Sequence, residues 1–444
     1  MTKTSFYNII LLLCLSLVIY YSLNVYFINH LQSTTPLDDG VVVGHSSNGK
    51  PGTSKVKPSK VAQNRDSPSN AHLVQSAIMR TAGVLKPAFR NRNPKYVHLK
   101  QELLAVVEPK PYNISTIWKT ANSWPKANEV VPGNEKLVGA VINAIATEPI
   151  LRIKNSQRGT QLKLVFEFAQ SQHVLFKPKW YNREEVINGT VYSGKDRHNS
   201  EIVSFHLAMI LNLRSTPIVA GRRISLRDHV SRTVPELQKT MPIVNNGQCI
   251  YGVCYYCNSD EMVCDDPESG LLEGAVLYTI PGKINKLRSP WQRTYDNAVL
   301  AAWEKNDNYC SMVRKKLTLE ALLDLIDAAL FDFLIQNGDR HHYETRDGRL
   351  LLLDNGKGFG NPFVDHMDIL APLYQCCIVR RTTWERLLLF SGGALTDTLR
   401  AMNELDLLKP LLTKEHYDAL ERRLLYIYGT VELCKEKYGT KLFK

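Results

Sequence analysis

Hydrophobic and polar positions divide the chain into an apolar start, a polar stretch and a long mixed region. Residues 7–28 are almost wholly apolar, and no Asp, Glu, Lys or Arg occurs from Thr4 to Pro36. This length is typical of a membrane-spanning helix. We therefore predict a signal anchor at 7–28 with a cytoplasmic end at 1–6, and a cleaved signal peptide is the alternative.

The polar stretch covers residues 29–95. It is rich in Ser, Pro, Gly, Asn and Lys and has no sustained hydrophobic period, so it is expected to form a flexible lumenal stem. Ordered structure is expected to begin between Tyr96 and Trp118. From there to the end no second linker occurs, which predicts one catalytic body at 96–444.

Periodicity within this body predicts strands first and mostly helices later. A hairpin is indicated where an alternating segment and a second short strand flank a polar turn. We expect strands at 162–168, 174–177, 275–280 and 350–353. We expect helices at 198–213, 318–336, 382–390 and 416–438, the second capped by Thr318. This order predicts a two-lobed α+β fold with a cleft between the lobes.

Composition is that of a globular protein, with 44% hydrophobic and 22% charged residues in 444. The net charge of +12 favours acidic partners such as an anionic membrane, a polyphosphate or a sulfated glycan. The basic residues are dispersed and no nucleic-acid-reading motif occurs, so we do not expect a nucleic-acid partner.

The cysteines agree with a lumenal location. One of nine, Cys14, lies in the apolar segment, and the remaining even number would pair as disulfides in an oxidising compartment. A zinc site formed by Cys249, Cys254, Cys257 and Cys264 is the alternative, but it requires reduced thiolates. Asn113 and Asn188 each begin an Asn-X-Ser/Thr glycosylation pattern.

An acid-rich stretch at 334–362 carries the candidate chemistry. Asp339 is followed five residues later by Glu344, and a short strand then leads into Asp354. Protein kinases place a catalytic Asp, a metal-binding side chain five residues on, and a strand ending in a metal-binding Asp in this order. Gly356, Gly358 and Gly360 follow, which would let neighbouring backbone approach closely.

The other half of a phosphoryl-transfer site needs a strand lysine and a helix acid. Lys177 ends the second hairpin strand, and Glu201 lies near the start of the next helix. No glycine-rich phosphate loop is evident; residues 158–161 are the nearest match. Turn capping by Asp339 and Asp354 is the simpler alternative, and we interpret His341-His342 as loop scaffolding.

Seven blocks resemble one family in that family's order. They are "GTQLK", "FKPK", "DRHNSE…FHL", "CYYC", "NGDRHHYE", "LLLDNGKGFGNP" and "APLYQCC", spread from about Gly139 to Cys434. Together they resemble the atypical secretory-pathway kinases, which include the Golgi casein kinase and the glycosaminoglycan xylosylkinase. The two-residue spacing in "CYYC" and the flanking segments are closer to the xylosylkinase branch.

The resemblance implies a role for each candidate residue. Asp339 would be the catalytic acid that receives the acceptor proton, and Glu201 and Asp354 would hold the metal. The nucleotide-binding positions would be Gln161, Lys163, Lys177, Tyr278, Thr279, Ile280, Pro281 and Glu344. The nucleotide would be ATP and the metal Mn²⁺, with Mg²⁺ as the alternative. Glu201 distinguishes the chain from the family's pseudokinase, which lacks that glutamate.

The resemblance also implies four disulfides, which the spacing alone leaves open. They are Cys249–Cys264, Cys254–Cys257, Cys310–Cys376 and Cys377–Cys434. The expected reaction is ATP-dependent phosphorylation of the 2-hydroxyl of xylose in the glycosaminoglycan–protein linkage region of proteoglycans, in the Golgi lumen. A secretory-pathway protein serine kinase and a catalytically inactive partner of a related kinase are the alternatives. Assembly with such a kinase, or secretion after stem cleavage, is compatible with the sequence.

Overall fold

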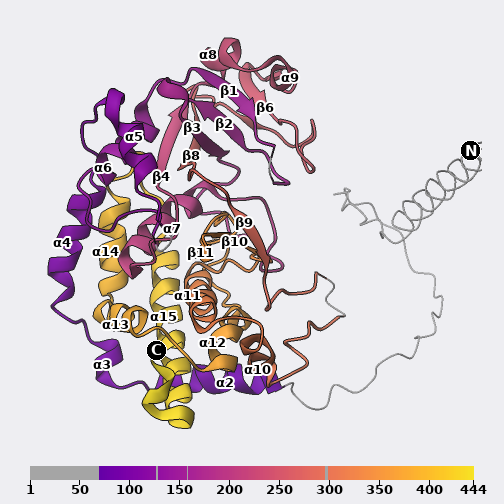
Figure 1. Ribbon diagram of the computed structural model, residues 1–444. Coiled ribbons are helices and arrows are strands. Elements are labelled where there is room, and N and C mark those ends of the chain that lie inside the picture. The colour runs from indigo at the N-terminus through magenta and orange to yellow at the C-terminus, as the bar shows by residue number, and fades with distance from the viewer. Residues whose placement is uncertain (1–69, 127–128, 158, 296–298) are drawn as a thin grey trace, which may run out of the picture. The chain divides into compact units, whose positions relative to one another are not determined.

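The predicted hairpin forms the middle of a five-stranded antiparallel sheet in the computed structural model (Figure 1). The structure describes residues 70–126, 129–157, 159–295 and 299–444, which fall within one compact unit. The strand order is β1-β2-β3-β8-β4. The strands are β1 (Arg152–Asn155), β2 (Leu164–Glu167), β3 (His173–Pro178), β8 (Leu272–Tyr278) and β4 (Val219–Ile224).

Alternating burial explains why the hairpin residues form strands. Leu164 and Phe166 of β2 and Val174 and Phe176 of β3 are fully buried, while intervening side chains are partly exposed. The rings of Phe166 and Phe176 stack with their centroids 4.8 Å apart. This packing fixes the register, because a shift by one residue would turn the apolar side chains outward.

Helix α7 (His198–Leu211) packs against β4 and β8 and is buried along its whole length. It ends at Asn212, which adopts a left-handed conformation with φ of 60°. The structure thus confirms the predicted helix but buries all of its faces rather than one stripe. Such a helix is held by the core on several sides, which fixes the position of the side chains in its first turn.

Two three-stranded sheets complete the β-structure. One consists of β5 (Ile243–Val244), β6 (Gly247–Ile250) and β7 (Val263–Cys264). The other consists of β9 (Asn285–Arg288), β10 (His342–Arg346) and β11 (Arg349–Leu351). The turn between β10 and β11 is the predicted Asp347-Gly348 pair, and both residues have positive φ, as a tight two-residue hairpin requires.

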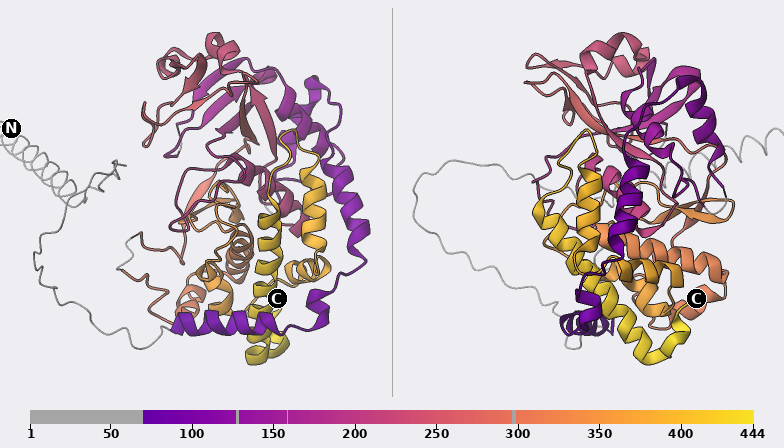
Figure 2. Two further views of the ribbon diagram at one scale, coloured as in Figure 1. Left: turned by 180° about the vertical axis from the view of Figure 1, so that it is seen from behind. Right: turned by 90° about the vertical axis from the view of Figure 1, so that its left-hand side faces the viewer.

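The second half of the chain is mostly helical, as predicted. Thr318 caps α11 (Leu319–Ile335) by accepting a hydrogen bond from the Ala321 backbone at 3.2 Å. Figure 2 shows α14 and α15 running alongside each other. The other helices of this half are α10 (Tyr309–Arg314), α12 (Ala371–Cys376), α13 (Arg381–Leu389), α14 (Ala394–Asn403) and α15 (Lys414–Tyr438).

Helices that precede the first strand pack against both the five-stranded sheet and the helical second half. α6 packs against β4, and α4 packs against α6 and α14. These helices are α4 (Tyr96–Val107), α5 (Ile114–Ser123) and α6 (Val138–Thr147). Short helices are α3 (Pro87–Arg90), α8 (Leu226–His229) and α9 (Pro235–Gln238), with single 3₁₀ turns at Ala169–Ser171, Val230–Arg232, Met367–Leu370 and Gly439–Leu442.

The structured body begins before residue 96, so the predicted lower limit at Tyr96 is wrong. Helix α2 (Asn70–Gly83) packs against α15 and buries Ile78 and Ala82. The prediction missed this helix because only a narrow apolar face interrupts an otherwise polar stretch. The predicted cytoplasmic end, the membrane segment and the stem before Asn70 lie outside the described residues. Among the residues described, no helix is both long and apolar enough to span a bilayer.

All four cysteine pairs implied by the family resemblance are present as disulfides. Their S–S distances are 2.01 Å for Cys249–Cys264, 2.03 Å for Cys254–Cys257, 1.86 Å for Cys310–Cys376 and 2.00 Å for Cys377–Cys434. The zinc alternative is therefore wrong, because its four thiols are consumed in two disulfides. Each of the other two disulfides joins segments more than 50 residues apart.

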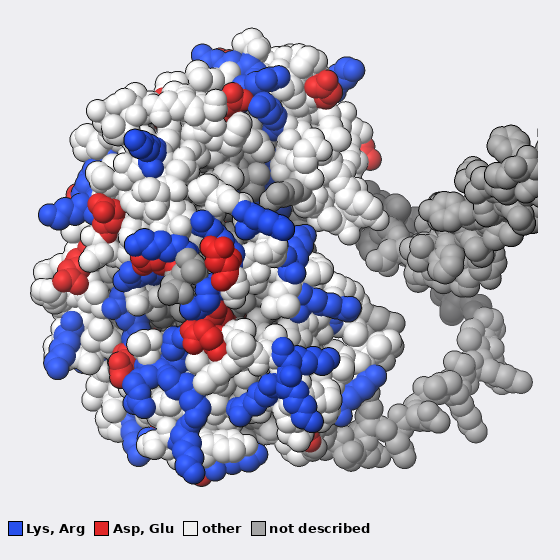
Figure 3. Space-filling model, viewed as in Figure 1, with Lys and Arg blue, Asp and Glu red and all other residues white. Residues whose placement is uncertain are grey.

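The face of the described residues shown in Figure 3 carries both signs of charge. Lysine and arginine side chains are spread over its lower half, with acidic side chains among them.

Candidate active site

Lys177 is the centre of a buried cluster of charges. It stands on β3 opposite Ala275 of β8, and its Nζ lies 3.0 Å from Asp196 Oδ2 and 2.5 Å from Glu201 Oε1. The same ammonium contacts Asp354 Oδ1. Glu201 comes from the first turn of α7. The strand lysine and the helix glutamate that the sequence paired therefore meet in the structure.

Burial and charge act against each other in this cluster. Burial alone would lower the pKa of Lys177, but the three surrounding carboxylates raise this pKa well above its usual value. Burial raises the pKa of Glu201 above its usual value, although Lys177 opposes the rise. Glu201 Oε2 is buried and has no hydrogen-bond partner among the described residues. An ionised carboxylate in this position calls for a further positive charge.

Asp354 follows β11 and adopts a left-handed conformation with φ of 58°. Its Oδ2 lies 3.3 Å from Lys163 Nζ, and its backbone oxygen accepts a hydrogen bond from Asn337 at 3.3 Å. Burial opposes ionisation, but Lys163 and Lys177 hold the pKa of Asp354 well below its usual value. The Asp354 side chain is 58% exposed to solvent. We conclude that this carboxylate is ionised and open to a ligand from solvent.

Asp339 lies on the loop between α11 and β10. Its backbone N–H donates to Asn337 Oδ1 at 3.2 Å, and its Oδ1 accepts a hydrogen bond from the Tyr295 hydroxyl at 2.8 Å. His341 Nδ1 lies 2.8 Å from the Asp339 backbone oxygen, which agrees with the predicted scaffolding role of this histidine. The neighbouring His342 is exposed and its ring packs edge-on against His341.

Asn337 connects the loops that carry Asp339 and Asp354, because its side chain accepts a hydrogen bond from the Asp339 backbone and donates one to the Asp354 backbone. The pKa of Lys357 is lowered by burial, while the charges of Asp196, Asp339 and Asp354 oppose that change. Glu344 stands on β10 opposite Leu351 of β11, and its pKa is raised by burial and further by the charge of Asp354. The structure thus gathers the predicted acids at one site.

A buried ion pair supports the Asp339 loop and was missed from sequence. Arg340 Nε lies 2.7 Å from Asp332 Oδ2, and its Nη2 lies 2.8 Å from Asp332 Oδ1. The same guanidinium donates to Asn355 Oδ1 at 2.7 Å and to the backbone oxygen of Leu353 at 2.5 Å. It therefore ties the Asp339 loop to the Asp354 loop. The sequence gives little indication of this ion pair, because Asp332 is a single polar residue within the apolar end of the predicted helix.

The three glycines after Asp354 permit the close approach that was predicted. A Cβ on Gly356 would lie 2.6 Å from Asp196 Cβ, and one on Gly358 would lie 2.6 Å from Ser200 Oγ. Arg197 fills the space beside Gly360 and donates to the backbone oxygens of this loop. The loop and the start of α7 are therefore packed directly against each other.

The predicted nucleotide-side residues differ in whether they contact the charged cluster around Lys177. Gln161 Nε2 donates to Asp196 Oδ1 at 3.1 Å, and the Asp196 backbone N–H donates to Gln161 Oε1 at 2.8 Å. Tyr278 turns away into the body, where its hydroxyl donates to Asn122 of α5. Of the three residues after it, Ile280 is buried, Pro281 is partly exposed and Thr279 is exposed. Asp196 itself was missed, although the acid directly before α7 was a visible signal.

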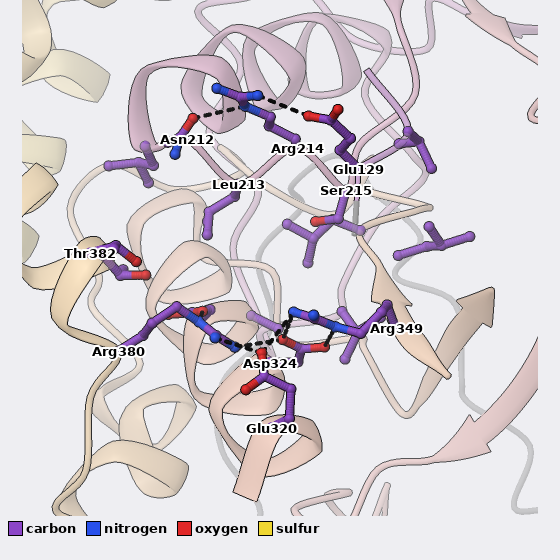
Figure 4. Close-up of a pocket in the computed structure, with 18 residues that line it drawn as sticks. Glu129, Asn212, Leu213, Arg214, Ser215, Glu320, Asp324, Arg349, Arg380 and Thr382 are labelled. Atoms are coloured by element: carbon purple, nitrogen blue, oxygen red, sulfur yellow. Dashed lines mark hydrogen bonds and ion pairs between the residues drawn. The ribbon is translucent and has the colours of Figure 1, made fainter. Parts of the chain in front are cut away.

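A separate cavity of about 260 Å³ lies behind the strand that leads to Asp354 (Figure 4). It is lined by an ion-pair network in which Asp324 accepts hydrogen bonds from Arg349 and Arg380 at 2.7 Å each. A second ion pair, Arg214–Glu129, closes its opposite side at 2.8 Å. None of the predicted site residues lines this cavity. Its charges neutralise one another, so we assign it a structural role.

Among the described residues, no group of three His, Cys, Asp or Glu side chains is arranged to hold a metal unaided. The carboxylates of Glu201 and Asp354 nevertheless supply the hard oxygen donors that Mn²⁺ and Mg²⁺ prefer. Such ions commonly use one or two protein carboxylates and take their remaining ligands from substrate phosphates and water. The unpartnered Glu201 Oε2 and the exposed Asp354 carboxylate fit that arrangement.

Fold and site together define a kinase-like phosphotransferase, with a strand lysine, a helix glutamate and two loop aspartates. Comparison with known families agrees. Residues 116–442 match the family model described as "Fam20C: Golgi casein kinase, C-terminal, Fam20". The chain belongs to the Fam20 family.

Individual relatives place the chain within this family. It is 48% identical over 367 residues to the glycosaminoglycan xylosylkinase homolog of Drosophila melanogaster, covering 81% of this chain and 87% of the relative. The solved structure of hydra Fam20 with sugar superposes with a TM-score of 0.71 at 36% identity, covering 75% of this chain and 99% of that one. The Golgi casein kinase with Mn/ADP bound gives 0.69 at 27% identity, covering 86% and 94%.

Proposed function

We propose that the protein is an ATP-dependent kinase that phosphorylates the 2-hydroxyl of xylose in the glycosaminoglycan–protein linkage region of proteoglycans. The observation that carries this proposal is the 48% identity to a relative named as a glycosaminoglycan xylosylkinase homolog. The match covers 87% of that relative's length. A structural neighbour solved with a sugar supports a carbohydrate acceptor.

ATP and Mn²⁺ are the proposed nucleotide and metal. A structural neighbour holds Mn/ADP, and the carboxylates of Glu201 and Asp354 have the chemistry that a hard divalent cation requires. Glu201 and Asp354 would hold the ion, which when bound neutralises developing phosphate charge. Lys177 and Lys163 face the same space and would bind phosphate oxygens. Gln161, Glu344 and the segment Tyr278–Pro281 remain the proposed nucleotide-side positions.

Asp339 is the proposed proton acceptor. Its carboxylate accepts the proton of the acceptor hydroxyl while that hydroxyl oxygen bonds to the γ-phosphorus and the bond to the ADP oxygen breaks. The Asn337 and Arg340 contacts hold the loop that carries Asp339, so its position does not depend on the acceptor. Positioning of this kind contributes most of the rate in phosphoryl transfer, because little covalent chemistry is required of the protein.

A protein serine kinase of the same fold is the second candidate. It is favoured by the family description and by the likeness to the Golgi casein kinase. The two candidates share the whole site described above and differ only in the acceptor. A catalytically inactive partner is a weaker alternative, because Lys177, Glu201, Asp339 and Asp354 are all present.

Transfer to matched acceptors tests the proposal. The full chain, purified in detergent, is incubated with ATP, Mn²⁺ and either a galactosyl-xyloside or casein, and phosphate on each acceptor is measured. We expect phosphate on the xylose of the glycoside. Phosphate on casein alone would favour the serine kinase, and nucleotide binding without transfer to either would favour the inactive partner.

The cellular setting is also a proposal. Residues 7–28 would anchor the protein in the Golgi membrane with residues 29–444 in the lumen, and the four disulfides support an oxidising compartment. Asn113 and Asn188 are exposed, as glycosylated residues must be. When the protein is expressed in the secretory pathway and digested with an N-glycosidase, its mass should fall by the mass of two glycans. No change in mass would contradict the lumenal location.

A further inference from the structure

The Tyr295 hydroxyl is hydrogen-bonded to the carboxylate of Asp339, the proposed proton acceptor. It donates to Asp339 Oδ1 at 2.8 Å and lies 3.0 Å from His341 Nδ1. An alcohol acceptor must place its own hydroxyl within the same distance of that carboxylate before its proton is transferred. Tyr295 thus makes, within the protein, the hydrogen bond that the reaction requires of the acceptor.

The position of Tyr295 is held by its surroundings but not locked by burial. Its ring packs edge-on against Tyr192 with the centroids 4.8 Å apart, and Tyr192 donates from its hydroxyl to the Tyr295 backbone oxygen at 3.5 Å. Tyr295 is 51% exposed. Its ring also lies edge-on to His341, with the centroids 6.1 Å apart. A half-exposed side chain with two edge-on ring contacts can move aside at lower cost than a buried one.

The charges at this position keep the phenol as a hydrogen-bond donor. Burial and the neighbouring Asp339 both raise the pKa of Tyr295 above its usual value, so the hydroxyl stays protonated. The hydrogen bond with Asp339 also raises the pKa of His341, which lies on the other side of the phenol. The Asp339 carboxylate therefore has a hydrogen-bond donor at Oδ1 before an acceptor arrives, with His341 Nδ1 3.7 Å from the same oxygen.

We propose that Tyr295 is a positioning residue that occupies the acceptor place at Asp339, excludes water from it, and is displaced by the acceptor hydroxyl. Water at this place would be activated by the same carboxylate and would hydrolyse ATP without transfer. Because Asp339 would activate the phenol as it activates an acceptor hydroxyl, the phenol escapes phosphorylation only while its oxygen stays out of line with the γ-phosphate. The inference rests on the proposed phosphoryl transfer and adds how that site avoids hydrolysis.

Replacing Tyr295 by Phe tests the inference, because the ring and its contact with Tyr192 remain while the hydroxyl is lost. We expect release of free phosphate from ATP and Mn²⁺, without acceptor, to rise about tenfold, the factor that corresponds to about 1.4 kcal/mol. The KM for the galactosyl-xyloside should fall, because no internal hydrogen bond has to be broken, and kcat should change little. Tyr255→Phe is the matched control, since Tyr255 is 81% exposed on the Cys254–Cys257 loop.

Two results would overturn the inference. One is phosphate release by the Tyr295→Phe protein equal to that of wild type and of Tyr255→Phe, with an unchanged KM. The other is phosphate found by intact mass on wild-type Tyr295, which would make the phenol an acceptor rather than a barrier. Failure of the proposed function gives a separate result. Wild-type protein would then leave the galactosyl-xyloside unphosphorylated, whether or not the Tyr295→Phe protein releases more free phosphate.

Discussion

At Lys177 one ammonium is surrounded by three carboxylates, and the balance between them decides both stability and chemistry. Lys177 is 3% exposed and Glu201 is 1% exposed, so neither charge is relieved by water. Their 2.5 Å contact therefore stabilises the folded state by compensating two buried charges. Removing one partner leaves an uncompensated buried charge, which is more costly than removing both.

Lys177→Met should consequently lower the free energy of unfolding by about 3–5 kcal/mol, the usual loss when one member of a buried pair is removed. The double variant Lys177→Met/Glu201→Gln should recover part of this loss, because the orphaned carboxylate is then absent. Urea unfolding of both proteins measures the difference. A single variant as stable as wild type would contradict the buried pair.

Asp354 differs from Glu201 because its carboxylate is 58% exposed, although it pairs with Lys177 and Lys163. Asp354→Asn should lower the melting temperature, because two lysines lose a paired charge, and at a temperature where the variant is folded it should lower Mn²⁺-dependent transfer by about 10²- to 10³-fold, as loss of one charge-stabilising group does. Asp347→Asn is the control, because Asp347 lies at the other end of the same hairpin and its side chain is 61% exposed. Normal turnover by Asp354→Asn would refute the site assignment.

At the scale of elements, α11 connects the active-site loop to the ion-pair network behind it. Asp332 on this helix binds Arg340, and Asp327, less than two turns earlier, lies 2.8 Å from Arg380 Nε. Burial raises the pKa of Asp327 from 3.8 to about 6 despite that arginine. The folded protein therefore binds a proton here at a pH where the unfolded chain has already lost it.

The sign of the pH effect follows directly. Between about pH 4 and about pH 6 the folded state holds more protons at Asp327, so this residue makes stability fall as pH rises. Asp327→Asn removes the effect. The stability of wild type relative to the variant should fall by about 2 kcal/mol from pH 4 to pH 7. Denaturant unfolding across this range checks it, with Asp347→Asn as control. A difference independent of pH would show that Asp327 is ionised throughout.

Sequence patterns predicted the elements that alternate or cap clearly. The β2–β3 hairpin, the Thr318 cap of α11 and the Asp347-Gly348 turn each carry a local signal, and each is present. The spacing of Asp339, Glu344 and Asp354 likewise fixed half of the site. Tyr295 was missed because its contact with Asp339 joins residues 44 positions apart. The contact of Asn337 with Asp354 and that of Asp196 with Lys177 likewise carry no local signal of their partners. The nucleotide-side position of Tyr278 comes from the resemblance and stays a prediction for its segment, while its hydroxyl donates to Asn122 of α5.

At the scale of the whole molecule, the N-terminal helix α2 is part of the helical body. Gly429 of α15 makes this packing possible, because a Cβ there would lie 2.9 Å from the Ile78 backbone oxygen and 3.1 Å from the Ala82 backbone nitrogen. Both contacts are with backbone, which cannot rotate away as a side chain can. Any residue larger than glycine at 429 must therefore push the two helices apart.

This geometry makes the contribution of α2 measurable. Gly429→Val should lower the free energy of unfolding by about 1–3 kcal/mol through overpacking, whereas Glu436→Val, on an exposed position of the same helix, should have a small effect. In a chain that begins at residue 96 the penalty at Gly429 should disappear, because the atoms it would strike are gone. Denaturant unfolding of the two full-length variants, full-length wild type, and the shortened chain with and without Gly429→Val separates packing from helix propensity. A penalty that persists without α2 would place its cause within α15 itself.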